Sequence, residues 1–260
     1  MKIKSPKISV IIPSFNKVRF IARTIDSIIA QNYPRFEIII MDGGSTDGTL
    51  GIINKYARKY PGIIQYQSKK DKGQWDAINK GFRLSKGKIL TYICADDEYL
   101  PGAFAEIEKM YRTNIDSFWF AGRGRVIDER GTRIAKWSTF YKNLLLFLNL
   151  RFLLLMTNYL MQPSVFMTRS AWERFGPFVG HNNFVLEYDF WLKISKVKMP
   201  VVTAKYLSSF RIEPGTISAS LSDALLSQDE KIVKKYTKNP LILLLHKLHN
   251  IGRLIVVKIV

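Results

Sequence analysis

Three runs of β-branched, apolar residues each end in a short turn that carries carboxylate or amide side chains. The runs and their turns are residues 8–13 before Ser14-Phe-Asn, residues 36–41 before Asp42-Gly-Gly-Ser, and residues 89–93 before Cys94-Ala-Asp-Asp. Such continuous apolar runs are typical of parallel strands that are buried on both faces. Open α/β sheets bind ligands beyond the carboxyl ends of their strands. The sequence therefore predicts a pocket there for a nucleotide and a metal ion.

The spacing of the runs predicts an α/β sheet with helices on both faces. Up to residue 97, strands alternate with helices expected at about residues 18–31, 49–60 and 74–84, with a further strand at 63–68. This order implies parallel pairing through right-handed crossovers. The rhythm then changes. The later expected elements are helices at 102–111, from Ser170 and at 186–196, and strands at 117–122, 125–128, 164–168 and 207–212.

The charge balance favours an anionic partner. The net charge is +19, from 40 Lys and Arg against 21 Asp and Glu. Many of the acids lie in the strand-end turns, whereas Lys247, Arg253 and Lys258 stand beside apolar runs. This placement indicates an anionic membrane surface more than nucleic acid. A solvated basic surface is the simpler alternative.

Two apolar segments raise the question of membrane insertion. Residues 143–161 are the most apolar stretch, but Arg151 lies in its middle. An arginine at the bilayer centre costs about 3 kcal/mol or more, so a packed or interfacial helix is the better interpretation. The chain is expected to be helical from residue 221. For residues 240–260 we expect an amphipathic helix in the membrane plane, or else one docked on the domain.

The adjacent pair Asp96 and Asp97 is the candidate metal site. Two neighbouring carboxylates at a strand end cannot both enter the core, because burial of charge is costly. Oxygen ligands at such a turn suit Mg²⁺ or Mn²⁺, which bind one or two carboxylates together with substrate phosphates. A solvated turn ahead of Pro101 is the alternative.

Asp42 and residues 71–77 are candidates for the nucleotide. Gly43 lets the backbone approach a planar ligand, so Asp42 can accept hydrogen bonds from a base or a ribose. Residues 71–77 open a helix whose positive end carries Asp71 and Asp76 and can meet sugar hydroxyls. Either segment can equally be an ordinary capped turn.

In their order and spacing, these segments resemble family 2 glycosyltransferases, which have the GT-A nucleotide-sugar fold. The matching text is Val10–Asn16, Ile39–Thr49, Lys72–Gly81, Gly87–Asp97, Gln162–Gly176 and Leu186–Lys193. The resemblance covers about residues 6–215. It implies a Rossmann-like, mostly parallel sheet flanked by helices, followed by C-terminal amphipathic helices. We expect a catalytic domain at 1–220, with a nucleotide-binding half at about 1–100 and an acceptor half at about 101–220, and a helical extension at 221–260.

The resemblance implies roles for the candidate residues. The nucleotide-sugar would be bound by Pro13, Ser14, Asn16, Asp42, Asp71, Gln74, Asp76 and Asp96. Asp42 would hold the base, and Asp71 would sit over the ribose side. The metal would be held by Asp96 and Asp97. Glu187 falls where the family places its general base.

Three positions depart from the family pattern. Cys94 stands where the metal motif often begins with Asp, and a thiol is a poor Mg²⁺ ligand, so coordination rests on Asp96, Asp97 and the phosphates. Glu187 replaces the usual Asp of the base position. Glu213 replaces a His that is frequent in a closing loop, where a carboxylate can still bind the metal.

Two assignments rest on side-chain geometry. A helix that begins at Leu186 puts Glu187 and Asp189 about 200° apart around its axis, so only one can face the donor. We favour Glu187 as the base and keep Asp189 as the alternative. Arg211 is a candidate for the diphosphate because a guanidinium fork suits phosphate, with a strand-edge arginine as the alternative.

The expected activity is inverting transfer of a sugar from a UDP- or GDP-linked donor to a hydroxyl of a lipid-linked or polysaccharide acceptor. Mg²⁺ or Mn²⁺ and a carboxylate base would assist it. We expect no nucleic acid partner and a peripheral position on the cytoplasmic face of the cell membrane. A non-catalytic nucleotide-sugar-binding or scaffold protein of the same fold is one alternative. A sugar-phosphate nucleotidyltransferase is another alternative, but residues 13–16 lack the Gly-rich basic loop that is typical of that enzyme class.

Overall fold

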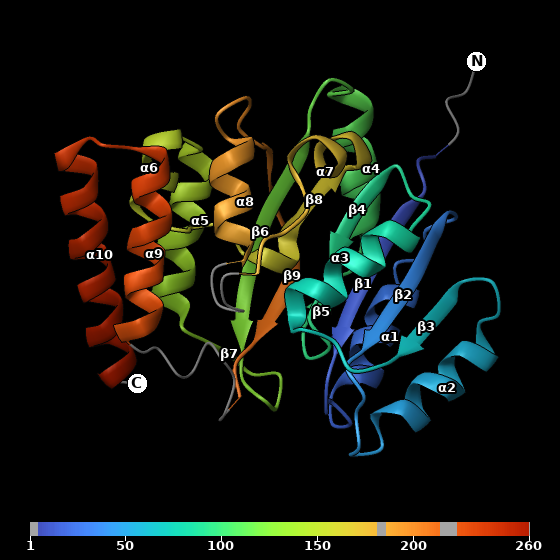
Figure 1. The fold of residues 1–260 in the computed structure, drawn as a ribbon. Helices are drawn as coiled ribbons and strands as arrows, with labels where there is room; N and C mark the ends of the chain where they lie inside the picture. The colour runs from blue at the N-terminus through green and yellow to red at the C-terminus, as the bar shows by residue number, and fades with distance from the viewer. Residues whose placement is uncertain (1–4, 181–185, 214–222, 260) are drawn as a thin grey trace.

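In the part of the chain that the structure describes, nine strands form one sheet with helices on both faces (Figure 1). The structure is a computed structural model that describes residues 5–180, 186–213 and 223–259. The strand order is β3-β2-β1-β4-β8-β6-β9-β5, and β7 pairs with β6. The predicted α/β class is therefore confirmed.

The N-terminal half of the sheet is parallel, as predicted. Its strands are β1 (Ile8–Ser14), β2 (Phe36–Asp42), β3 (Ile64–Ser68) and β4 (Ile89–Tyr92). The connecting helices are α1 (Ile21–Ile29), α2 (Thr49–Lys59) and α3 (Gln74–Leu84). Because β1 pairs with both β2 and β4, the three strands that precede the acid and amide turns are neighbours.

The second half of the sheet is mixed. Its strands are β5 (Glu98–Tyr99), β6 (Trp119–Ile127), β7 (Arg133–Ile134), β8 (Val165–Thr168) and β9 (Val201–Arg211). Strand β8 runs antiparallel to β4 and β6, whereas β9 runs parallel to β6. The helices are α4 (Ala103–Thr113), α5 (Lys136–Leu148), α6 (Arg151–Met156), α7 (Arg169–Phe175) and α8 (Leu186–Ile194), with a short 3₁₀ helix at Gln162–Ser164.

The predicted strands at 117–122 and 125–128 are wrong as separate elements. They form the single strand β6, which pairs with β9 through register shifts between Gly122 and Gly124. Such shifts disturb the alternation of apolar and polar residues, so the sequence pattern looks like two strands. The strand expected at 207–212 begins earlier, at Val201.

The apolar stretch 143–161 is neither one helix nor a span. Asn149 has a left-handed φ of 50° and ends α5, so that α6 begins anew at Arg151. Asparagine tolerates this conformation better than the leucines around it. The buried side chains of α6 pack into the core, in agreement with the preferred interpretation of a packed helix.

Alternate residues of the strands pack into two separate hydrophobic layers, one on each face of the sheet. In β1, Val10 and Ile12 face the layer that α1, α2 and α4 cover, while Ile11 faces the layer of α3 and α5–α8. Helix α3 approaches the sheet closely at Gly81, where an added Cβ would lie 2.4 Å from Cγ2 of Ile11. This close packing holds the last turn of α3 against the middle of β1.

The chain ends in α9 (Asp223–Tyr236) and α10 (Pro240–Ile259), on the side of the molecule away from α2 (Figure 1). Helix α9 packs against α8, and α10 packs against α6 and α9. None of the described helices combines the length and hydropathy needed to cross a membrane. The expected boundary at residues 220 and 221, and the side chains of Arg253 and Lys258, lie outside the described residues.

Candidate active site

The three strand-end turns lie side by side at one edge of the sheet. Ser14 at the end of β1 pairs with Asp42 at the end of β2, and Ile11 of β1 pairs with Tyr92 of β4. The carboxyl ends of parallel neighbours meet at the same edge, and ligands of open α/β sheets bind there. The acid turn after β4 and the glycine turn after β2 therefore flank the end of β1.

Asp97 is the most buried carboxylate of the acid turn. Its side chain has no exposed surface, its Oδ1 accepts a hydrogen bond of 2.8 Å from the backbone N–H of Arg211, and its Oδ2 has no partner among the described residues. Burial and the negative charge of Asp96 raise the pKa of Asp97 well above its ordinary value. A buried carboxylate oxygen without a donor is costly, which favours a cation beside it.

Arg211 holds the acid turn in place through bonds to its backbone and to the neighbouring Glu98. Its buried guanidinium donates 2.8 Å to the backbone oxygen of Asp96 and 2.7 Å to that of Asp128, and it pairs with the Glu98 carboxylate. It also lies over the ring of Phe20. Because protein acceptors use its donors and its side chain is 1% exposed, we revise its predicted role from diphosphate ligand to positioning residue.

Lys17 is a member of this site that the sequence analysis missed. Its Nζ lies 2.6 Å from Oδ2 of Asp96 and 2.6 Å from Oε1 of Glu213. Burial lowers the pKa of Lys17, but the charges of Asp96 and Glu213 outweigh burial and raise it overall. The structure thus brings Asp96 and Glu213 together, as the sequence predicted, but both carboxylates pair with the ammonium group of Lys17. A basic residue right after the Ser14-Phe-Asn turn was the available signal.

The acid turn fits a hard divalent ion. One ligand atom each of Cys94, Asp96 and Asp97 lies within 4.8 Å of the others, and Oδ2 of Asp97 is buried without a partner. Burial and the charge of Asp97 raise the pKa of the Cys94 thiol well above its ordinary value. A protonated thiol is a poor ligand, so the oxygen atoms are the donors that suit Mg²⁺ or Mn²⁺.

Asp42 shapes the glycine turn after β2. Its Oδ2 accepts hydrogen bonds from the backbone N–H of Ser45 at 2.9 Å and from the hydroxyl of Ser68 at 2.6 Å, and the Ser45 hydroxyl donates to Oδ1. The carboxylate is buried. The first role of Asp42 is therefore structural. A hydrogen bond to a nucleobase would have to use the lone pairs of the carboxylate that Ser45 and Ser68 leave free.

Gly43 leaves a gap between two side chains that can meet a planar ligand. A Cβ at this position would lie 3.2 Å from Oδ2 of Asp71 and 3.3 Å from Cδ2 of Phe15. The Phe15 ring is 60% exposed, a signal for stacking that the sequence analysis did not use. An exposed aromatic face beside a carboxylate suits a nucleobase, because every base offers a face to stack and donors on its edge.

A cavity of about 340 Å³ opens between α3 and the ends of β2 and β3. Asp42 and Asp71 both line it, together with the basic residues Lys69, Lys80 and Arg83. The two acids that sequence reasoning assigned to the nucleotide therefore border one hollow, although they come from different turns.

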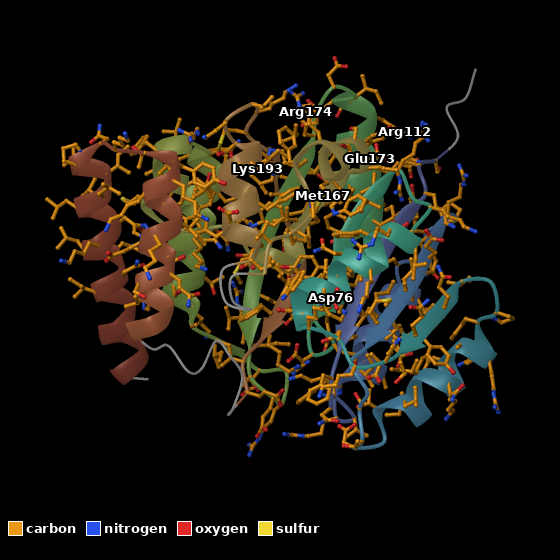
Figure 2. The ribbon with its side chains drawn as sticks, in the orientation of Figure 1. Asp76, Arg112, Met167, Glu173, Arg174 and Lys193 are labelled. Carbon is orange, nitrogen blue, oxygen red and sulfur yellow. The ribbon has the colours of Figure 1, made fainter. Side chains whose placement is uncertain are left out.

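The start of α3 joins this hollow to the acid turn. Oδ1 of Asp71 accepts 2.8 Å from the Gly73 backbone N–H, and the Gln74 amide donates 3.1 Å to Sγ of Cys94. Asp76, at the lower end of α3 in Figure 2, pairs with Lys80 at 2.6 Å. Asp71 and Gln74 thus face the site, whereas the Asp76 carboxylate accepts hydrogen bonds from Lys80 and from the backbone N–H of Lys72, just before the helix.

The turn after β1 is built by side chains that the sequence assigned to the nucleotide. Asn16 has a left-handed φ of 51°, and its Oδ1 accepts 3.0 Å from the Thr46 backbone N–H. This bond ties the turn after β1 to the turn after β2. The Ser14 hydroxyl is buried without a partner among the described residues, and Pro13 is buried within β1. Ser14 is therefore a polar group that a ligand can satisfy.

Glu187 and Asp189 point to different surroundings, as the helical spacing predicts. The Asp189 carboxylate accepts a hydrogen bond of 3.0 Å from the Tyr236 hydroxyl of α9. Glu187 is partly buried, and burial raises its pKa to about 7. The charge of Glu187 also raises the pKa values of Tyr92 and Cys94, which places it within electrostatic range of the acid turn.

The chain matches a known family over most of its catalytic-size unit. Residues 9–174 match the family model "Glycosyl transferase family 2". An uncharacterized glycosyltransferase of Rickettsia prowazekii is 28% identical over 262 residues, which cover 95% of this chain and 78% of that protein. A PGL/p-HBAD biosynthesis glycosyltransferase of Mycobacterium bovis is 38% identical over 93 residues, or 36% of each chain. An uncharacterized glycosyltransferase of a Nostoc species is 34% identical over 108 residues, which are 42% of this chain and 34% of that protein. The chain thus spans about a third of the length of the last two relatives.

Solved structures share the fold. The mannosyltransferase PcManGT from Pyrobaculum calidifontis, in complex with GDP-Man and Mn²⁺, superposes with a TM-score of 0.71 at 19% identity, covering 98% of this chain and 74% of that chain. TarS of S. aureus, residues 1–349 in complex with UDP-GlcNAc, gives a TM-score of 0.64 at 15% identity, covering 88% of this chain and 71% of that chain. The likeness confirms the predicted GT-A fold.

Proposed function

This chain belongs to glycosyl transferase family 2, and from this premise we propose that it transfers a sugar from a nucleoside-diphosphate sugar to an acceptor hydroxyl. One observation carries the proposal: a cluster of carboxylates lies at one edge of the sheet, and a separate carboxylate with a raised pKa lies within electrostatic range of it. The cluster consists of Asp96, Asp97 and Glu213, and the separate group is Glu187. The structures of relatives with UDP-GlcNAc and GDP-Man support such a donor.

The two groups divide the chemistry of the transfer. The leaving nucleoside diphosphate gains negative charge, which a cation held at the acid turn would stabilise. The acceptor hydroxyl loses a proton, and a carboxylate with a pKa of about 7 is well matched to accept it near neutral pH. Attack on the face opposite the leaving group inverts the anomeric centre. We therefore assign Glu187 as the general base in an inverting transfer.

Mg²⁺ or Mn²⁺ is the proposed cofactor. Asp96, Asp97 and Glu213 would hold it, and it would neutralise charge on the diphosphate. The Mn²⁺ in the PcManGT complex supports this assignment. On the donor side, we propose that the base stacks on Phe15 above Gly43, with Asp71 toward the ribose.

A panel of UDP- and GDP-linked sugars tests the proposed activity. We expect at least one donor to release its nucleoside diphosphate with Mn²⁺ or Mg²⁺ present, and EDTA to abolish the release. Asp97→Asn should lose this turnover by at least about a hundredfold, because it weakens the proposed metal site. Lys7→Gln, at the opposite edge of the sheet, is the control. Binding of UDP or GDP without release from any donor would instead establish the non-catalytic alternative.

We further propose that the acceptor is a lipid-linked or polysaccharide glycan at a membrane surface. Helix α5 carries an exposed apolar stripe, which includes Trp137 at 86% and Phe147 at 68% exposure. Helix α10 carries another, which includes Leu241 and Leu248. The stripe of α5 consists of Trp137, Phe140, Leu144, Phe147 and Leu148, and that of α10 of Leu241, Leu244, Leu248 and Ile251.

The spacing of both stripes is that of one helix face. The two helices touch, because the rings of Tyr141 and His249 stack at 5.7 Å. Exposed lysines flank the stripes at Lys136 and Lys247. Apolar faces edged by basic residues suit an interface with anionic lipid. This arrangement supports a peripheral position on the cytoplasmic face of the membrane.

Vesicle co-sedimentation tests the membrane proposal. We expect binding to vesicles that contain phosphatidylglycerol, and weaker binding to pure phosphatidylcholine. The double variant Phe147→Ser, Leu248→Ser should lower the affinity by about tenfold or more, because each half-buried apolar side chain contributes about 1 kcal/mol. Ile115→Ser is the matched control, since Ile115 is 60% exposed but lies outside both stripes. Equal loss in both proteins would refute a role of the stripes.

A further inference from the structure

The ammonium group of Lys17 lies where a cation would bridge the acid cluster. Its Nζ is 2.6 Å from Oδ2 of Asp96, which follows β4, and 2.6 Å from Oε1 of Glu213, which follows β9. Asp96 is separated from Lys17 by 79 positions in the chain and Glu213 by 196. Two carboxylates from remote segments thus share one internal cation.

The backbone around Lys17 fixes the origin of this side chain. Its N–H donates 2.8 Å to Oγ1 of Thr49, and the preceding Asn16 adopts a left-handed φ of 51°. The side chain itself is 26% exposed. A fixed backbone with a long, partly solvated side chain can therefore keep its anchor while the ammonium moves between partners.

We propose that Lys17 is an internal counter-cation that competes with the divalent ion for Asp96 and Glu213, so that metal binds tightly only together with a nucleoside diphosphate. The diphosphate gives the ammonium a new anionic partner, and the two carboxylate oxygens become free for the metal. This inference rests on the proposed function only where it takes the acid turn as the metal site.

The coupling follows from the charges. Without nucleotide, a metal ion must displace an ammonium group that already satisfies both carboxylates. With nucleotide, the phosphate oxygens compensate the displaced ammonium. Metal and diphosphate therefore strengthen each other's binding, and by linkage the factor is the same in both directions. A protein that lacks the ammonium should lose much of this coupling.

The experiment measures Mn²⁺ binding to the full chain by electron paramagnetic resonance of free Mn²⁺, without and with UDP and, in parallel, GDP. Lys17→Gln should bind Mn²⁺ alone about tenfold more tightly than the wild type, which equals about 1.4 kcal/mol. Lys7→Gln is the matched control, because Nζ of Lys7 lies 2.6 Å from Glu37 and its side chain is 28% exposed. Lys17→Ala provides a second charge-free variant. Lys17→Arg keeps the positive charge and should bind Mn²⁺ alone as weakly as the wild type.

Each outcome decides the inference. Tighter Mn²⁺ binding by Lys17→Gln and Lys17→Ala, but not by Lys7→Gln, supports it. Unchanged or weaker binding by both charge-free variants overturns it and leaves the proposed activity intact. Absence of Mn²⁺ binding in every protein, even with nucleotide, overturns it together with the metal assignment. Donor turnover in EDTA would then show that the transferase proposal survives without a metal.

Discussion

Replacement of Glu187 by Gln should stabilise the protein at alkaline pH while it abolishes most turnover. Burial raises the pKa of Glu187 from 4.5 to about 7. The folded protein therefore holds this proton more tightly than the unfolded chain does. Such a group stabilises the fold fully below pH 4.5, and this contribution is lost as the pH rises toward 7.

The size of the effect follows from the two pKa values. The difference between 4.5 and about 7 corresponds to about 3 kcal/mol of unfolding free energy, at about 1.4 kcal/mol for each tenfold change in proton affinity. Because Glu187 is partly exposed, solvent screening reduces this value. We expect the Gln variant to gain about 1 to 3 kcal/mol over the wild type between pH 5 and pH 8.5.

Urea denaturation at pH 5 and pH 8.5 measures this gain. Asp189→Asn is the control, because Asp189 lies on the same helix but bonds to Tyr236. In parallel, turnover of Glu187→Gln should fall by about 10² to 10⁴, the usual loss for a general base, with UDP or GDP affinity nearly unchanged. Wild-type turnover should rise with pH through about 7. A stability gain of the same size at both pH values would refute the reasoning.

Three further predictions concern the scaffold. Arg211→Met should lower the unfolding free energy by about 3 kcal/mol or more in urea denaturation, because it leaves buried acceptors unpaired. Gly81→Ala should cost about 1 to 3 kcal/mol, since its Cβ would meet Ile11 at 2.4 Å; an unchanged melting temperature would contradict this packing. Tyr236→Phe should lower the unfolding free energy by about 1 kcal/mol and leave turnover unchanged. A loss of turnover would instead indicate that Asp189 rather than Glu187 is the base.

The local pattern of the sequence was enough for the parallel half of the sheet. Helix α3 begins at Gln74 and ends at Leu84, as predicted, and β1, β2 and β4 match their predicted runs within one residue. Because a parallel strand is buried on both faces, it appears in the sequence as a continuous apolar run. The mixed half carries the register shifts between β6 and β9 and two-residue strands, such as β5 and β7, which leave no such pattern in the sequence.

The sequence also placed the acid turn at a strand end. Its expectation that the two carboxylates cannot both enter the core is wrong, because Asp96 and Asp97 are both buried. It could not say which partners these acids have. Arg211 illustrates the difference: the residue type suits phosphate, but the fold surrounds it with the backbone oxygens of Asp96 and Asp128. The choice between two roles of one side chain was therefore made by its neighbours and not by its chemistry.

Local sequence by itself determined the parallel strands, the glycine and acid turns and the edge of the sheet where they meet, since side-chain direction follows from the backbone period alone. Only the tertiary structure decided that Lys17 lies between Asp96 and Glu213, and that Asp189 accepts a hydrogen bond from Tyr236 of α9 while burial raises the pKa of Glu187. These pairings join segments far apart in the chain. Their energies depend on distance and burial, which no local pattern encodes.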